Sequence, residues 1–134
     1  RSMPAYVVDK VKLALSSKEK SLPGSRVLVL GIAYKKNVDD MRESPSVEIM
    51  QQLQDTGAHV SYCDPLVPVF PNMRKYHFDL TSVPFTPEDL AGFDCVVIST
   101  NHDVFDYDLL AANAQLIVDA RGVYRHRTDK IFQA

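Results

Sequence analysis

The sequence has little cysteine, little net charge and no long hydrophobic run. Two cysteines stand in 134 residues, each inside or just after a strand-like apolar stretch, so reduced thiols fit better than a disulfide framework. A formal net charge of -2 gives no basis for wholesale binding to nucleic acid or to an anionic membrane. No apolar run approaches the roughly 20 residues of a membrane span, and no signal-peptide pattern opens the chain. These absences predict a soluble, cytoplasmic protein.

The length suits one domain with a single core. Hydrophobic residues make up 46% of the chain and charged residues 24%, which is ordinary for a globular protein. Arg1 and Ser2 are followed at once by helix-like sequence, so we expect the native protein to extend upstream.

Strand-like and helix-like stretches alternate along the chain. Continuously apolar runs predict four strands buried on both faces, at residues 26–31, 59–63, 95–99 and 115–119. Helical spacing and capping residues such as Ser44 and Thr86 predict helices at about 4–15, 45–56, 87–90 and 102–112. Residues 66–83 are predicted to be mostly loop with a short strand or turn, and no element is predicted beyond Arg125. This order predicts a single α/β domain with a Rossmann-like, doubly wound parallel sheet.

In such sheets ligands bind beyond the carboxyl ends of the strands. Here those ends carry polar residues: Tyr34 and Lys35, Asp64, residues 100–102, and Arg121 after Asp119. We therefore expect Lys35 and Arg121 to line one open concave surface at this edge of the sheet.

The loop after the first predicted strand, residues 31–44, lacks the glycine fingerprint of a dinucleotide site. Only Gly31 of the pattern G-x-G-x-x-G is present, so the domain lacks the usual means of holding NAD by itself. The loop instead offers cations for phosphates and Tyr34 for stacking on a base, the cations being Lys35, Lys36 and Arg42. The alternative is a solvated charged loop, because three acids nearly balance these cations, and from the residues alone this alternative is favoured.

Two further residues at the same edge keep alternatives open. Asp64 stands where a Rossmann acid would bind ribose hydroxyls, but without the glycines an Asp-Pro turn is favoured. Arg121 is either a second cation for a ligand or the partner of Asp119 in an ion pair.

No catalytic or metal-binding residue is predicted. His102 and Asp103 are adjacent, and adjacent residues rarely face one site, so Asp103 is interpreted as a helix-start residue. Neither Cys63 nor Cys95 has a neighbour that marks a nucleophile. No zinc site is predicted, because no ligand spacing joins the cysteines to the remaining histidines, His59, His77 and His126.

The stretch from Leu30 to Pro45, L-G-I-A-Y-K-K-N-V-D-D-M-R-E-S-P, closely resembles the UDP-glucose/GDP-mannose dehydrogenase family. The C-terminal domain of that family opens with G-x-A-[FY]-K followed by D-D-x-R-E-S-P. The resemblance covers essentially the whole chain and continues at residues 3–8, 57–60, 62–65 and 118–124. Its two ends are most similar to members that act on UDP-N-acetylated hexosamines.

The resemblance implies one part of a larger enzyme that oxidises the C6 alcohol of a UDP-sugar, a UDP-N-acetylhexosamine or UDP-glucose, to a carboxylate with NAD. An N-terminal NAD-binding domain and a central helical dimerisation segment would precede this chain, and the full-length enzyme would be a homodimer. Residues 1–20 would be the helix linking that segment to a C-terminal nucleotide-sugar-binding domain, residues 21–134. The family's nucleophile lies in a G-G-x-C segment that this chain lacks, so neither Cys63 nor Cys95 inherits the role.

The resemblance also implies roles for four residues. Lys35 matches the family lysine that contacts the UDP-sugar, and Tyr34 takes the adjacent aromatic position. Arg121 matches an arginine near the UDP-sugar, whereas Arg42 matches one that reaches the NAD held by the other domain. The residues themselves leave two other functions open, a stand-alone Rossmann-like nucleotide-binding or regulatory module and a purely structural interaction domain.

Overall fold

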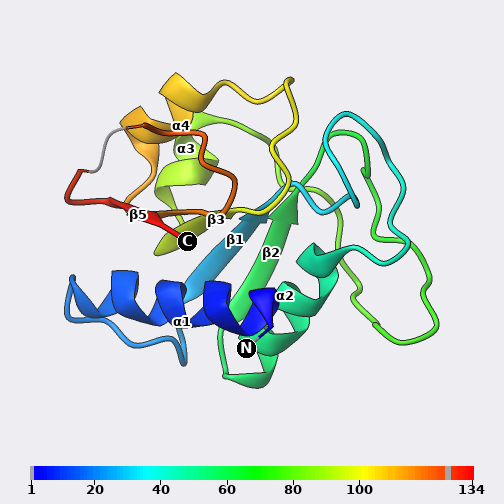
Figure 1. Cartoon of the computed structure of the whole chain (residues 1–134), viewed down its shortest axis with the longest axis horizontal. Coiled ribbons are helices and arrows are strands. Elements are labelled where there is room, and N and C mark those ends of the chain that lie inside the picture. Colours follow the sequence, from blue (N-terminus) through cyan, green and yellow to red (C-terminus); the bar gives the residue numbers. More distant parts are fainter. Residues whose placement is uncertain (1, 126–127) are drawn as a thin grey trace.

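The computed structural model describes residues 2–125 and 128–134, so Arg1 and His126, both named above, lie outside the described residues (Figure 1). The strands form one parallel sheet in the order β2-β1-β3-β4-β5. They are β1 (Arg26–Leu30), β2 (His59–Cys63), β3 (Cys95–Ile98), β4 (Ile117–Asp119) and β5 (Ile131–Gln133). The helices are α1 (Met3–Ser16), α2 (Pro45–Asp55), α3 (Pro87–Ala91) and α4 (Tyr107–Asn113). The predicted α/β fold class is confirmed.

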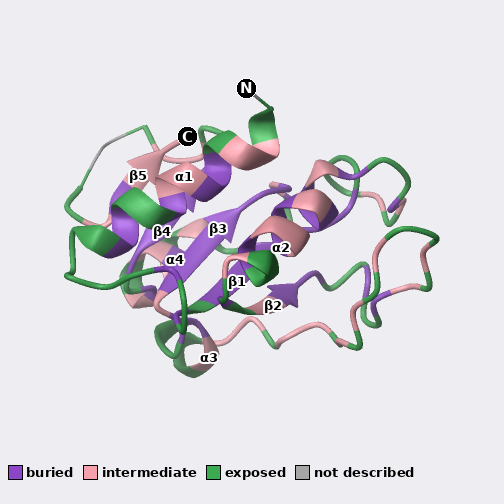
Figure 2. Cartoon of the chain, turned by 90° about the horizontal axis from the view of Figure 1, so that it is seen from below, coloured by how far each residue is buried: buried purple, intermediate pink, exposed green. Residues whose placement is uncertain are grey.

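Helices cover both faces of the sheet, which explains why its central strands β1 and β3 are almost continuously apolar (Figures 1 and 2). Val27 and Val29 of β1 pack into the core formed with α1 and α2. Leu28 and Leu30 point to the opposite side and pack with α3 and α4. Alternate side chains of one strand therefore contribute to two separate cores, one on each face of the sheet. Each core needs its own layer of helices, which is the doubly wound arrangement.

The predicted helix caps are present where the sequence placed them. Ser44 caps α2 ahead of Pro45, and Thr86 caps α3 by accepting a hydrogen bond from the N–H of Asp89. The predicted start of the fourth helix was wrong, because α4 begins only at Tyr107 with Asp106 as its cap. Residues 102–106 are turns instead, since the segment from His102 is drawn toward the loop after β1 by the hydrogen bonds described below.

The C-terminal part holds a strand that the sequence did not predict. β5 has three residues that pair in parallel with β4 at the edge of the sheet, and only Ile131 among them is buried. So short a strand, half covered, has no periodicity to detect. Between β2 and α3, the predicted short strand is an isolated antiparallel bridge between Val69 and Thr81.

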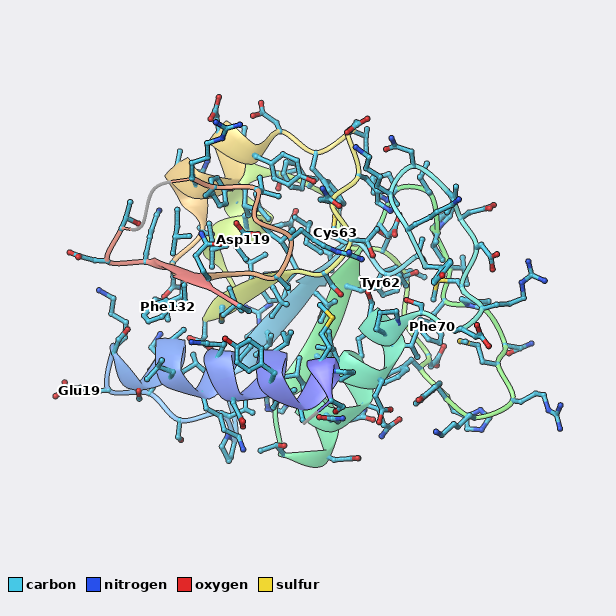
Figure 3. The ribbon with its side chains drawn as sticks, viewed as in Figure 1. Glu19, Tyr62, Cys63, Phe70, Asp119 and Phe132 are labelled. Carbon is cyan, nitrogen blue, oxygen red and sulfur yellow. The ribbon has the colours of Figure 1, made fainter. Side chains whose placement is uncertain are left out.

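Segment 66–83 is anchored to the sheet by aromatic contacts. The rings of Tyr62 and Phe70 lie 6.0 Å apart edge to face, and Phe70 contacts Phe78 at 5.2 Å. Figure 3 shows Tyr62 and Phe70 on the side of the molecule where this segment projects, away from Asp119 at the end of β4. The segment is therefore held at its base by these rings and by a backbone hydrogen bond of 2.8 Å from the N–H of Val83 to the carbonyl oxygen of Tyr62, rather than by a regular sheet.

The first helix is part of the domain's core. Its buried residues lie on one face and pack against α2 and the sheet; they are Val7, Val8, Val11, Ala14 and Leu15. The described parts of the chain include no helix that is long and apolar enough to cross a membrane.

Candidate functional site

The chain leaves the central strand β1 toward β2 on one side, while β3 lies on its other side. The loops that leave the carboxyl ends of β1 and β3 therefore run in opposite directions. The place where they part is the switch point at which open α/β sheets bind ligands. At their start the two loops still touch: Gly31, with φ +77°, lies so close to Thr100 that an added Cβ atom would overlap the carbonyl oxygen of Thr100. Only glycine fits this position, and the backbone of one loop rests directly on the other.

A cavity of about 430 Å³ opens at this edge. It collects residues from five parts of the chain: Met3 of α1, Tyr34, Lys35 and Lys36 after β1, Pro45 of α2, Asn101 after β3 and Arg121 after β4. The expectation that Lys35 and Arg121 line one surface is confirmed.

Arg121 is oriented by the backbone rather than by an acid. Its Nε–H donates to the carbonyl oxygen of Ser99 at 2.7 Å, and no other hydrogen bond joins its guanidinium to the residues that the structure describes. Asp119, the predicted alternative partner, instead accepts from the backbone N–H groups of Arg121 and Tyr124 at 3.0 and 2.9 Å. Because a guanidinium carries five N–H donors, most of those on Arg121 are left for a ligand.

The other groups in the cavity complete a cationic site with an aromatic wall. Lys36 makes only an exposed contact of 3.8 Å with Asp103, which is worth little in water. Lys35 has no ion pair within the described residues, and Tyr34 is 50% exposed. Cations next to an exposed ring suit a phosphorylated ligand that carries a planar or sugar ring.

Arg42 lies outside this cavity. Its guanidinium makes two hydrogen bonds to Asp40, at 3.1 and 2.9 Å, although its side chain is 89% exposed. The hydrogen bonds from Arg42 lower the pKa of Asp40 to about 2. Arg42 lines a separate hollow with Met41, Glu43 and residues 71–76. The structure thus brings Tyr34, Lys35 and Arg121 together and leaves Arg42 apart, at the far end of the same loop.

A buried carboxylate–imidazole pair lies behind the cavity, and sequence reasoning missed it. Asp64 and His102 are both fully buried, with His102 Nε2 at 2.8 Å from Asp64 Oδ2. Burial alone would raise the pKa of Asp64, but hydrogen bonds from His102 and from the N–H of Ile32 outweigh it and hold the pKa below its usual value. The predicted turn is also present, since the N–H of Leu66 donates to Asp64 Oδ1 at 3.0 Å. One feature of the sequence could have predicted this pair: Asp64 and His102 both follow predicted parallel strands, whose carboxyl ends lie at the same edge of the sheet.

These contacts do not fit a Rossmann-type NAD site within the described residues. Asp64, where a ribose-binding acid would stand, has both carboxylate oxygens committed to groups of the protein. At the start of α2, the N–H of Ser46 is bonded to Ser44 Oγ, which itself donates to the carbonyl oxygen of Ile32. The pyrophosphate of NAD would therefore find neither the glycines nor the free helix terminus that hold it in a Rossmann-type site.

Neither cysteine has the properties of a nucleophile. Cys63 and Cys95 are free and buried, and burial raises the pKa of each thiol to about 12. Both remain thiols at neutral pH, and only the thiolate is reactive. Across residues 2–125 and 128–134, no group of three histidine, cysteine, aspartate or glutamate side chains is arranged to hold a metal ion.

The fold and the cavity together define a Rossmann-like α/β domain that has a cationic cavity at its switch point and lacks the NAD fingerprint. The chain belongs to the UDP-glucose/GDP-mannose dehydrogenase family: residues 28–126 match the model of its UDP binding domain.

Similar proteins extend the match beyond residues 28–126. A UDP-N-acetyl-D-mannosamine dehydrogenase of Methanococcus maripaludis is 32% identical over 93% of this chain, and a UDP-glucose 6-dehydrogenase of Rhizobium meliloti is 39% identical over 76%. This chain covers 29% and 24% of those two proteins. The solved structure of the UDP-N-acetyl-mannosamine dehydrogenase of S. aureus is 26% identical, with a TM-score of 0.71 over 98% of this chain and 31% of that one. The chain therefore spans less than a third of the length of these relatives.

Proposed function

We propose that this chain is the nucleotide-sugar-binding C-terminal domain of a cytoplasmic, NAD-dependent nucleotide-sugar 6-dehydrogenase. The whole enzyme would oxidise the C6 alcohol of a UDP-sugar, either a UDP-N-acetylhexosamine or UDP-glucose, to a carboxylate. Residues 1–20 would link the domain to a central dimerisation segment, and the full-length enzyme would be a homodimer. Support for this proposal comes from the family match and from the names of relatives that are several times longer than this chain.

One observation carries the binding part of the proposal, namely that cations from two separate strand ends meet in one cavity. Lys35 and Arg121 would hold the pyrophosphate of the UDP-sugar, and Tyr34 would pack against a ring of the ligand. Such contacts are remote from the reacting carbon, but they hold the substrate in register with groups on another domain. The domain can serve the reaction in this way without supplying a base or a nucleophile.

Arg42 is assigned to the cofactor. NAD would be bound mainly by the N-terminal domain, since the residues described here do not fit a Rossmann-type site for it. The exposed guanidinium of Arg42 would reach toward that domain from the tip of the loop. Asp40 already binds Arg42, so this contact would require the arginine to share or exchange its partner.

Calorimetric titration of the chain with UDP, UDP-sugars and NAD tests the proposal. We expect binding of UDP and UDP-sugar, no binding of NAD, and no production of NADH when UDP-sugar and NAD are supplied together. NADH production by this chain alone would refute the assignment. Tight binding of NAD would favour the stand-alone nucleotide-binding module instead.

A further inference from the structure

His102 lies directly beneath the loop that carries Lys35. Its side chain is fully buried, and each ring nitrogen has one partner from a different part of the chain. Nδ1 accepts a hydrogen bond of 2.8 Å from the backbone N–H of Asn37, and Nε2 lies 2.8 Å from Asp64 Oδ2. The imidazole therefore joins the end of β2 to the backbone two residues after Lys35.

These partners define the protonation state of the ring. A backbone N–H can only donate, so Nδ1 must carry a lone pair and no proton. Asp64 can then accept the proton on Nε2, and the ring is a neutral imidazole in one tautomer. A proton added to Nδ1 would face the N–H of Asn37 and break that hydrogen bond.

The hydrogen bond from Asn37 is one of several that hold the short segment around Lys35. On the other side of the lysine, the N–H of Tyr34 donates to the carbonyl oxygen of Asp40 at 2.7 Å, and Thr100 Oγ1 donates to that of Ala33 at 2.7 Å. Asn37 itself is in the left-handed region with φ +64°, a conformation that asparagine adopts more readily than most other non-glycine residues. Two residues separate the anchor at Tyr34 from the anchor at Asn37, and Lys35 is the first of them.

We propose that His102 is a positioning residue of the binding site: through its unprotonated Nδ1 it fixes Asn37 and thereby the place of Lys35 in the cavity. Asp64 supports it by accepting the Nε2 proton and so selecting the tautomer that can accept from Asn37. The proposed function enters only in naming the ligand of Lys35, a pyrophosphate. The positioning itself is a property of the ligand-free chain.

Two conservative variants separate the two ends of the imidazole. In His102→Asn the short amide places an oxygen near the position of Nδ1, so it can still accept from Asn37 while the contact with Asp64 is lost. In His102→Gln the longer amide places an N–H near the position of Nε2, so it can still donate to Asp64 while the contact with Asn37 is lost. Each variant loses one of the two hydrogen bonds that the imidazole of His102 makes, so the two variants form a matched test.

Hydrogen exchange of the Asn37 amide in the ligand-free chain is the first measurement, referred to the amide of Val97 in β3. We expect exchange in His102→Gln to be about two- to tenfold faster than in the wild type, and that in His102→Asn to stay near the wild-type rate. The exposed His59 provides the control pair His59→Asn and His59→Gln, for which no difference is expected. Equal acceleration in both His102 variants, or none in either, would overturn the proposal.

Nitrogen NMR of the His102 ring and titration with UDP complete the test. A non-protonated Nδ1 resonance near about pH 7 is expected, and a protonated one would contradict the proposal. UDP affinity should fall in His102→Gln by a factor similar to the exchange effect and be retained in His102→Asn. If the wild-type chain binds no UDP, the proposed ligand is wrong, whereas the exchange and NMR results still decide the positioning role.

Discussion

The two limbs of the loop after β1 are built in different ways. The inner limb, residues 31–37, is fixed to side chains that follow β2 and β3: Ile32 to Asp64, and Asn37 to His102. In the outer limb, residues 38–43, Met41 is buried in the core, but the guanidinium of Arg42 is bound locally, to Asp40 two residues away. The charged side chains on the two limbs therefore differ in whether they already have a partner. Within the described residues Lys35 has no ion pair, whereas Arg42 already has Asp40 as a carboxylate partner.

This difference shows that equal charge does not make equal binding groups. A cation whose neighbouring backbone is already fixed by buried contacts requires less ordering of the loop when an anion binds, so more of the interaction contributes to affinity. Arg42 must give up or share a charge-assisted contact first, and its exposed position screens what it gains. Substitutions in each limb can test whether the contrast holds.

The largest effect is expected for Gly31→Ala at the root of the inner limb. An added Cβ meets the carbonyl oxygen of Thr100 while φ is +77°, so the junction of the two loops must open. We expect the free energy of unfolding to fall by roughly 3 kcal/mol. Gly24→Ala is the matched control, because φ there is +83° but no atom lies within 4 Å of the added carbon. Urea unfolding in which both variants lose the same stability would contradict a steric role for Gly31.

The next largest effect is a pH-dependent loss of folding stability in Asp64→Asn. The pKa of Asp64 is lowered in the folded chain, so its contribution to stability is present above the unfolded-state pKa and is lost as pH falls through the folded-state pKa. At neutral pH the variant should be less stable by roughly 1.5–3 kcal/mol, and the gap should narrow below about pH 4. Urea unfolding of both proteins between about pH 7 and pH 3 provides the measurement. A gap that stays constant over this range would show that the carboxylate charge is not what stabilises the inner limb.

In the proposed full-length dehydrogenase, Lys35→Ala and Arg42→Ala should impair the use of different substrates. Loss of a charge-assisted hydrogen bond to phosphate, roughly 1.5–3 kcal/mol, should raise the KM for UDP-sugar by about one to two decades in Lys35→Ala. Arg42→Ala should instead weaken the use of NAD. Steady-state kinetics with each substrate varied in turn would decide. Small and equal effects on both substrates would mean that the whole loop is only a solvated connector.

The smallest effect concerns the outer limb by itself. In the present chain, Arg42→Ala should leave the melting temperature nearly unchanged, because both partners of the Asp40 pair are exposed to water. The pKa of Asp40 should rise from about 2 toward the usual aspartate value of 3.8, because hydrogen bonding to the Arg42 side chain is the largest cause of its lowering. NMR titration of the Asp40 carboxyl group measures this shift. An unchanged pKa would mean that backbone N–H groups of the outer limb, and not the Arg42 side chain, stabilise the Asp40 carboxylate.

The elements that the sequence predicted well are those with a local cause. The apolar run of β1 and the pairing of Ser44 with Pro45 at the start of α2 act over a few residues, so they can be recognised without tertiary structure. The meeting of Lys35 with Arg121 was also predictable, because parallel strands end at a common edge.

What the sequence did not predict depends on distant partners. His102 was interpreted as part of a helix because nothing near it in sequence indicates Asp64, 38 residues away, as its partner. The late start of α4 has the same origin, since hydrogen bonds to Asn37 hold the backbone of residues 102–106 out of helical geometry. β5 exists only as an addition to the edge of β4, and three residues carry too little pattern to predict it.

The cavity walls have a thermodynamic consequence, because they come from segments as far apart as Met3 and Arg121. A ligand bound to all of them at once has no partial site in an unfolded or half-unfolded chain, so its binding energy is linked to the complete folding equilibrium. At a concentration of about 100 times Kd, such a ligand adds about 2.7 kcal/mol to the unfolding free energy. Heat denaturation in the presence of candidate nucleotides should therefore shift by several degrees in a single cooperative transition. The same linkage makes thermal stability a direct way to rank nucleotide sugars as candidate ligands of this chain.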